Sequence, residues 1–395
     1  MATPRSSVYN AMSGGSVWAG IEGPPAWLTA AVNAWGQISG TAAPSELQDY
    51  SGTAFRDTGT ITEIFAALGG GHSGNVTTNR AMVIDLSADS PAWVTARASG
   101  DFTGYDDDTM THLPSDGSPG PRHLYNAVVW SPTGGDYVFG GRYYAFDGSD
   151  DGSSYDKIDG FNRSNNTWRA SGYYPAREET FCPFSVIDPS TGILYASEGQ
   201  EGTAIGGFKM DPSTRVISSW HSTSGANCGR GPNVWDTNRG KCYQLGPQTY
   251  EYWSSVTCSL TVATDGTKQA ILFNSSAAYT AFTGQAANYL SPAMVYDQTG
   301  DCFYWYNGDD GRGASGSSNR VYKITPNGTS TWDMSAIDGG GVTVPATRSS
   351  VGGWDGSKYT SGNFSGTLSN LHFIDRWGVL LLVRPGQNIH YMRVR

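Results

Sequence analysis

The chain has 395 residues and a formal net charge of −10 at pH 7; only 15% of its residues are charged, whereas 52 are Gly, 22 Tyr and 13 Trp. Gly is typical of tight turns, and Tyr and Trp favour pleated strands, so this composition predicts an all-β protein. The acidic balance disfavours a nucleic-acid partner, and no apolar run approaches the roughly 18 residues that a membrane span needs.

Residues 1–34 precede the first predicted strand and form a predicted arm. They contain Trp18, Trp27 and the small apolar run Ala30-Ala-Val32, but no apolar core of a signal peptide. We therefore expect no signal peptide and folding in a cytoplasm. The arm is interpreted either as a docking segment for another protein or as a segment that packs across the base of the fold.

From residue 35 to residue 395, a hairpin unit of two apolar strands recurs six times. The tight turn of each unit ends in Gly, and most turns include Asp: Arg56-Asp-Thr-Gly59, Ser131-Pro-Thr-Gly-Gly135, Asp188-Pro-Ser-Thr-Gly192, Asp236-Thr-Asn-Arg-Gly240, Asp297-Gln-Thr-Gly300 and Asp375-Arg-Trp-Gly378. Asp accepts backbone hydrogen bonds within such turns, and Gly takes a positive φ there without a Cβ clash. A third strand follows each hairpin, and in most units a Trp follows that strand, which we expect to pack between neighbouring blades: Trp93, Trp168, Trp220 and Trp332.

This repeat predicts a single β-propeller of about six four-stranded blades. The blades are placed near residues 51–97, 122–172, 180–224, 231–275, 290–336 and 367–395. The last blade has only three strands, and Trp35-Gly-Gln-Ile-Ser39 has the pattern of a fourth. We expect this N-terminal strand to pair with the C-terminal blade and close the ring, because an unpaired edge is a template for aggregation.

Segments of the first two predicted blades resemble a kelch repeat, whose pattern is Pro-Arg, an apolar strand, a double Gly and then Trp. The matching segments are Pro121-Arg122-His123, Tyr137-Val-Phe-Gly-Gly141 and Asn166-Thr-Trp168, with Gly69-Gly-Gly-His72 in the blade before. Later blades depart from the pattern, with Gly246-Pro and Arg384-Pro-Gly where a double Gly belongs. The resemblance implies kelch-like blades and a structural role for Arg122.

The long irregular segments all leave one predicted end of the propeller, which we interpret as the binding face. Tyr143, Tyr144 and Tyr250 are predicted to lie in its loops, where exposed aromatic rings stack on sugars or anchor a protein partner. Arg122 and His123 lie near the predicted mouth of the central channel and complete the set of candidate ligand-binding residues.

Asp147, Asp150 and Asp151 lie in a Gly/Ser-rich loop of the same predicted face. Clustered carboxylates suit Ca²⁺, although the spacing is not that of an EF-hand, and a solvated acidic loop explains the same residues. These three are the candidate metal ligands, and no other cofactor is expected.

Arg122, Arg177 and Arg230 precede the first strands of three successive blades, and Glu178 follows Arg177. If these side chains converge, the arginines could bind a carboxylate and Glu178 could act as a general acid or base. Structural roles explain the same residues, and no complete catalytic motif is present. The favoured interpretation therefore assigns no catalytic residue.

Two hypotheses follow. The favoured one is a non-enzymatic binding or structural propeller that presents its loops to a glycan or protein receptor. The low Lys content and the small-residue-rich N-terminus resemble phage tail or head-decoration proteins. That resemblance implies a virion protein, folded in the host cytoplasm, whose residues 1–34 contact other virion proteins. The alternative is a carbohydrate-active hydrolase, lyase or mutarotase that acts on an acidic sugar.

Overall fold

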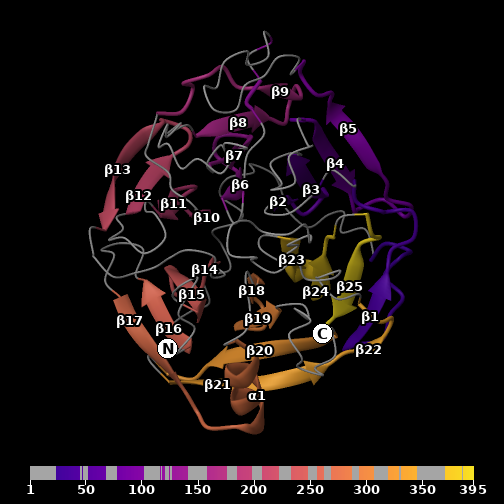
Figure 1. Cartoon of the computed structure of the whole chain (residues 1–395), viewed down its shortest axis with the longest axis vertical. Coiled ribbons are helices and arrows are strands. Elements are labelled where there is room, and N and C mark those ends of the chain that lie inside the picture. The colour runs from indigo at the N-terminus through magenta and orange to yellow at the C-terminus, as the bar shows by residue number, and fades with distance from the viewer. Residues whose placement is uncertain are drawn as a thin grey trace, which may run out of the picture.

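The structure is a computed structural model in which strands surround a central axis as a β-propeller (Figure 1). It describes residues 24–44, 47, 52–67, 78–101, 116, 118–120, 124, 127–140, 158–175, 185–197, 207–221, 233–247, 256–261, 268–286, 293–306, 319–328, 331–344, 370–384 and 386–395. The prediction of an all-β propeller is confirmed. No helix in these ranges is long and apolar enough to cross a membrane.

The first three sheets are separate four-stranded antiparallel meanders, here called units 1 to 3. Unit 1 contains β2 (Thr53–Asp57), β3 (Thr62–Ala67), β4 (Ala81–Asp85) and β5 (Trp93–Arg97). Unit 2 contains β6 (Val128–Ser131), β7 (Asp136–Phe139), β8 (Asp159–Asn162) and β9 (Thr167–Trp168). Unit 3 contains β10 (Ser185–Ile187), β11 (Leu194–Ser197), β12 (Gly207–Asp211) and β13 (Val216–His221).

The next sheet has eight strands and consists of two meanders, units 4 and 5. Unit 4 contains β14 (Asn233–Asp236), β15 (Lys241–Pro247), β16 (Val256–Thr261) and β17 (Lys268–Phe273). Unit 5 contains β18 (Ala293–Asp297), β19 (Cys302–Tyr306), β20 (Arg320–Pro326) and β21 (Thr331–Asp338). The outer strands β17 and β21 pair in parallel and join the two meanders. The described strands therefore form five hydrogen-bonded sheets, which differs from the predicted six four-stranded blades.

The last sheet, unit 6, combines both ends of the described chain. It contains β23 (Leu371–Ile374), β24 (Val379–Leu382), β25 (His390–Arg393), β1 (Ala34–Gln37) and the two-residue β22 (Gly340–Gly341). β1 pairs antiparallel with β25, Trp35 lying opposite Met392. On its other side β1 pairs in parallel with β22, which follows the outer strand of unit 5. The observed closure thus differs in detail from the prediction, with a shorter N-terminal strand and a fifth strand.

In Figure 1 the first strands of the units surround the centre, and β5, β13, β17, β21 and β1 lie at the rim. Aromatic side chains fill the spaces between neighbouring units. Phe65 of unit 1 stacks on Tyr137 of unit 2 with ring centroids 4.2 Å apart. Trp332 of unit 5 lies 4.9 Å from Tyr243 of unit 4, so this Trp packs between units as predicted.

The short hairpin turns share one end of the propeller, here called the turn end: residues 58–61, 132–135, 188–193, 237–240, 298–301 and 375–378. Asp57 accepts a hydrogen bond from the backbone N–H of Gly59 (3.0 Å), and Gly59 has a φ of 85°. Asp297 likewise accepts one from the Gly300 N–H (2.7 Å), but here the positive φ of 46° belongs to Asp301. The expectation that Gly300 supplies the left-handed residue is therefore wrong, because the left-handed position is the last residue of this four-residue turn, and Asp301 occupies it.

The opposite end, here called the loop end, carries the connections between second and third strands and those between units. One of these connections contains the helix α1 (Ala277–Ala286), which the sequence analysis missed. The hydroxyl of Ser276 accepts a hydrogen bond from the backbone N–H of Tyr279 (3.0 Å) and caps the helix. Phe282 is fully buried and anchors the helix on units 4 and 5.

Residues 24–34 of the predicted arm pack on the propeller. The ring of Trp27 meets Trp377 and Tyr391 edge-on, with centroids 5.9 and 5.1 Å away. The indole of Trp27 donates a hydrogen bond to the Leu86 carbonyl of unit 1 (3.1 Å), and Tyr391 donates to the Trp27 carbonyl (2.7 Å). This part of the arm therefore connects units 6 and 1. The remainder, residues 1–23, lies outside the described residues.

Candidate functional site

The residues predicted to form a site fall outside the part of the chain that the structure describes. This applies to the ligand-binding candidates, the acidic loop and the arginine cluster alike: Arg122, His123, Tyr143, Tyr144, Tyr250, Asp147, Asp150, Asp151, Arg177, Glu178 and Arg230. The described residues nevertheless contain three buried polar constellations, one at the turn end and two at the loop end.

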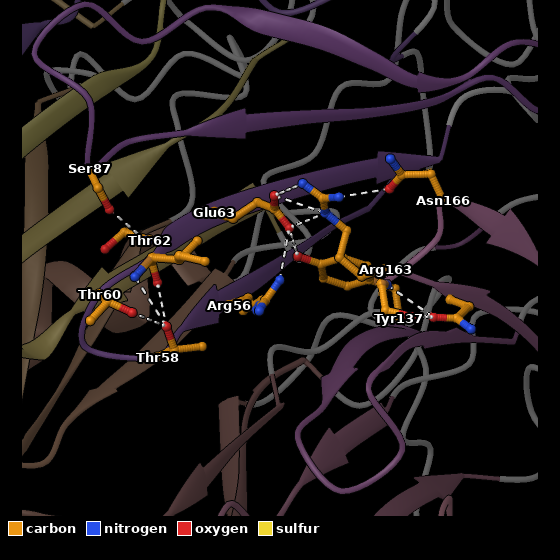
Figure 2. A network of polar contacts seen from close by, with 12 residues as sticks. Arg56, Thr58, Thr60, Thr62, Glu63, Ser87, Tyr137, Arg163 and Asn166 are labelled. Carbon is orange, nitrogen blue, oxygen red and sulfur yellow. Dashed lines mark hydrogen bonds and ion pairs between the residues drawn. The ribbon is translucent and has the colours of Figure 1, made fainter. Parts of the chain in front are cut away.

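The turn-end constellation is centred on the carboxylate of Glu63 in β3, whose side chain is only 2% exposed (Figure 2). Arg163, which follows β8 in unit 2, donates from Nη2 to Oε2 (2.6 Å) and from Nε to Oε1 (2.9 Å). The Tyr137 hydroxyl donates to Oε1 (2.7 Å), and Arg56 Nη1 lies 3.8 Å from the same oxygen. Asn166 accepts a hydrogen bond from Arg163 Nη1 (2.7 Å) and fixes the guanidinium.

A Glu, a Tyr and two Arg could in principle perform acid–base chemistry, but this group is closed to a ligand. Both oxygens of Glu63 already accept hydrogen bonds from Arg163, and Tyr137 is fully buried. Burial, together with the adjacent charge of Glu63, raises the pKa of Tyr137 well above its usual value. The constellation therefore acts as a clamp between units 1 and 2.

Further ion pairs join neighbouring units at the same end. Arg376 of unit 6 pairs with Asp57 of unit 1 (3.1 Å). Arg239 of unit 4 pairs with Asp301 of unit 5 (2.6 Å), and this arginine holds the pKa of Asp301 down at about 2. The C-terminal Arg395 reaches Asp297 of unit 5 (3.3 Å). These contacts join neighbouring units at the turn end, and each of the charged groups named here has a partner.

The first loop-end constellation lies between the first strands of units 1 and 6. The Thr53 hydroxyl donates a hydrogen bond to Asn370 Oδ1 (3.0 Å). Its single hydrogen is thereby used, so the hydroxyl oxygen must accept a hydrogen bond from His372 Nε2–H, which lies 2.8 Å away. Phe55 stacks on the imidazole with centroids 5.5 Å apart. Burial lowers the pKa of His372 to about 3, so the ring is neutral at pH 7.

The second loop-end constellation lies between units 5 and 6. Arg384 follows β24, is 5% exposed, and donates from Nη2 to the Tyr306 hydroxyl (3.3 Å). His390, the first residue of β25, lies directly opposite Leu382 and is also buried. Burial and the positive charge of Arg384 lower the pKa of His390 to about 4. No sequence motif marks these two residues, because they come together only when β24 and β25 pair.

Neither end offers a metal centre in the described ranges, where no group of three or more His, Cys, Asp and Glu side chains could hold an ion. The predicted calcium ligands Asp147, Asp150 and Asp151 lie outside those ranges. Binding of Ca²⁺ therefore remains a prediction.

No protein-family model matches the sequence. No curated protein matches it either. Solved structures are similar to the chain over most of its length. One is a protein assigned as a gluconolactonase, with a TM-score of 0.47 and 10% identity over 93% of this chain and 94% of that one.

A chain of a mitotic checkpoint complex gives a TM-score of 0.42 with 11% identity over 94% of this chain and 96% of that one. A GH74 xyloglucanase from Xanthomonas campestris gives 0.44 with 11% identity over 92% of this chain and 48% of that one. Similarities at these TM-scores do not indicate a function for this chain.

Proposed function

We propose that this chain is a non-enzymatic binding propeller that holds a glycan or protein partner at its loop end. The observation that supports this proposal is the asymmetry of the two ends. The turn end has short hairpins and ion pairs between units, whereas the connections 68–80, 98–127, 140–158, 222–232, 307–319 and 342–370 all leave at the loop end. Long connections on a rigid scaffold are where binding residues concentrate.

The clamp around Glu63 supports a binding role over catalysis. A general acid or base must reach the proton that it transfers, and the carboxylate of Glu63 is enclosed by Arg163 and Tyr137. The candidate contacts of the binding propeller are the loop aromatics Tyr143, Tyr144 and Tyr250, together with Arg122 and His123.

This proposal has three further parts: the blades are kelch-like, each of the six units is one blade, and the protein is part of a virion. They rest on the repeat and on the sequence resemblances alone. In that setting the receptor is bound at the loop end, and residues 1–23 contact other virion proteins. The acidic residues Asp147, Asp150 and Asp151 would hold Ca²⁺ in the same loops.

The alternative is a carbohydrate-active enzyme whose active site is formed by Arg122, Arg177, Glu178 and Arg230. A glycan array of the purified chain, screened with and without Ca²⁺ and then read by mass spectrometry, separates the two proposals. Binding with every array glycan intact supports the binding propeller. Product formation that is lost in Glu178→Gln would overturn it in favour of the enzyme.

A further inference from the structure

Arg384 is the one buried arginine among the described residues, and no carboxylate of those residues forms an ion pair with it. Arg163, Arg169 and Arg239 each form an ion pair, with Glu63, Asp136 and Asp236 respectively. Arg384 is more buried than any of them, and its hydrogen bond to the Tyr306 hydroxyl has a neutral acceptor. Within the described part of the chain, Nε and Nη1 of Arg384 have no hydrogen-bond partner.

His390 adds a further donor on the same side of unit 6. Both side chains face unit 5. Leu380 and Leu382 lie on the face of β24 that packs against unit 5, and Arg384, two residues further on, lies on the same face. His390 is on this face too, because it lies opposite Leu382 in the neighbouring strand. The amide nitrogen of Gln37, which can only donate, lies 3.5 Å from His390 Nε2. The ring hydrogen is therefore placed on Nδ1, for which the described residues show no hydrogen bond, although a contact with the backbone of Asn388 raises the pKa of the ring.

This arrangement is costly for the free protein. A buried charge needs a counter-charge or several hydrogen bonds to offset the water that it loses, and burial already lowers the pKa of Arg384. Proteins keep such unfavourable groups mainly at functional sites, where a ligand supplies the missing partner. An anion that accepts from Arg384 and His390 would remove the cost.

We propose that Arg384 and His390 bind the carboxylate of an acidic sugar at the loop end, in the seam between units 5 and 6. This inference rests on the proposed function and names the chemistry of its ligand. The carboxylate accepts charge-assisted hydrogen bonds from the guanidinium and a further one from the imidazole Nδ1–H. Because both unpartnered nitrogens of Arg384 are covered in the free protein, neighbouring side chains must move apart first, so association is slower than a diffusion-limited encounter.

The experiment follows thermal unfolding of the full chain with galacturonate and glucuronate as probes, and with galactose and glucose as uncharged controls. The variant Arg384→Met removes the charge but keeps much of the apolar bulk. The matched control is Arg163→Met, which breaks a buried ion pair far from the seam.

We expect the uronates, and not the neutral sugars, to raise the Tm of the wild-type chain. Without ligand, Arg384→Met has an equal or higher Tm than the wild type, and it loses the response to uronates. Arg163→Met has a lower Tm and keeps that response. A Tm that falls in Arg384→Met as it does in Arg163→Met would show that Arg384 is a structural residue and overturn the proposal, as would a uronate response that survives in Arg384→Met.

A second measurement covers the case in which Arg384→Met does not fold. The Nε resonance of Arg384 in the wild-type chain is followed by NMR during titration with galacturonate, and Arg384→Lys is titrated by calorimetry. A shift of that resonance, with affinity at least about tenfold weaker in Arg384→Lys, is expected. An unmoved resonance contradicts the proposal. If the wild type and Arg384→Met both bind neutral glycans equally well, this inference is wrong, but the proposed function still holds.

Discussion

Arg163 holds the buried carboxylate of Glu63 across the seam between units 1 and 2, with 2.6 Å between Nη2 and Oε2. The two residues are 100 positions apart in the chain. Their contact shows how the ring is held: charged side chains of one unit reach into the turn end of the next, while aromatic rings pack beneath them. The stability of the ring should therefore depend on a few contacts between units.

The first prediction concerns this clamp. Arg163→Met leaves Glu63 buried without its main partner, so the free energy of unfolding should fall by about 3 kcal/mol. Urea denaturation measures this loss. The matched control is Arg320→Met, which removes a pair with Asp338, whose side chain is 65% exposed; it should cost less than about 1 kcal/mol. Equal losses in the two variants would contradict the role of the clamp.

The second prediction concerns ring closure at β22. Gly341 has a φ of 81°, and a Cβ atom there would collide with the Trp35 carbonyl oxygen. Gly341→Ala should therefore cost about 1–3 kcal/mol and weaken the pairing with β1. Gly340 is a neighbouring control, because a Cβ there meets nothing within 4 Å. If Gly340→Ala destabilises the chain as much as Gly341→Ala, the close approach to Trp35 does not matter.

The third prediction concerns pH. The pKa of His372 is about 3 in the folded chain, against about 6.5 when unfolded. The unfolded chain therefore binds more protons below pH 6.5, and stability falls as the pH drops from 6.5 towards 3. The slope is about 1.4 kcal/mol per pH unit for this group, and His390, lowered to about 4, adds to it in the same direction.

Denaturant unfolding between pH 6.5 and pH 5 tests this slope. In His372→Asn the free energy of unfolding should depend less steeply on pH, because one of the two histidines with a lowered pKa is gone. An unchanged slope would mean that His372 is protonated, or accessible to water, in the folded state.

The fourth prediction concerns the N-terminal segment. The Tyr391 hydroxyl accepts hydrogen bonds from the backbone N–H groups of Thr29 (3.0 Å) and Ala30 (3.1 Å). Tyr391→Phe leaves both donors without their acceptor and should cost about 1–3 kcal/mol. Amide hydrogen exchange should become faster at Thr29 and Ala30 and stay unchanged in unit 3. Unaltered exchange at these two amides would show that the segment is held by other contacts.

Much of the fold could be predicted because hairpin turns are local. Asp188, placed by sequence at a turn, accepts hydrogen bonds from the backbone and hydroxyl of Ser190, and Gly192 takes a φ of 75°. The parallel pairing of β17 with β21 could not be predicted, because nothing near either strand encodes which distant strand it meets.

The three polar constellations were harder to predict than the strands, because their residues are distant in sequence and meet only when the units pack together. Glu63 and Arg163 are ordinary charged residues in sequence, and only the packing of unit 1 against unit 2 brings them together. Arg384 was noted only as a departure from the kelch pattern, and its burial depends on unit 5. The helix α1 was missed because its sequence has little apolar periodicity, although Ser276 was a readable cap.

The central claim is that the partner binds at the loop end. We would test it by screening three forms of the chain on one glycan array: the wild type, Tyr143→Ala/Tyr144→Ala, and Thr58→Ala/Thr60→Ala. The last pair lies in an exposed hairpin at the turn end. If the partner binds at the loop end, the wild type and the turn-end variant should bind the same glycans, and the tyrosine variant should lose them. Binding that survives in the tyrosine variant and disappears in the turn-end variant would contradict the account.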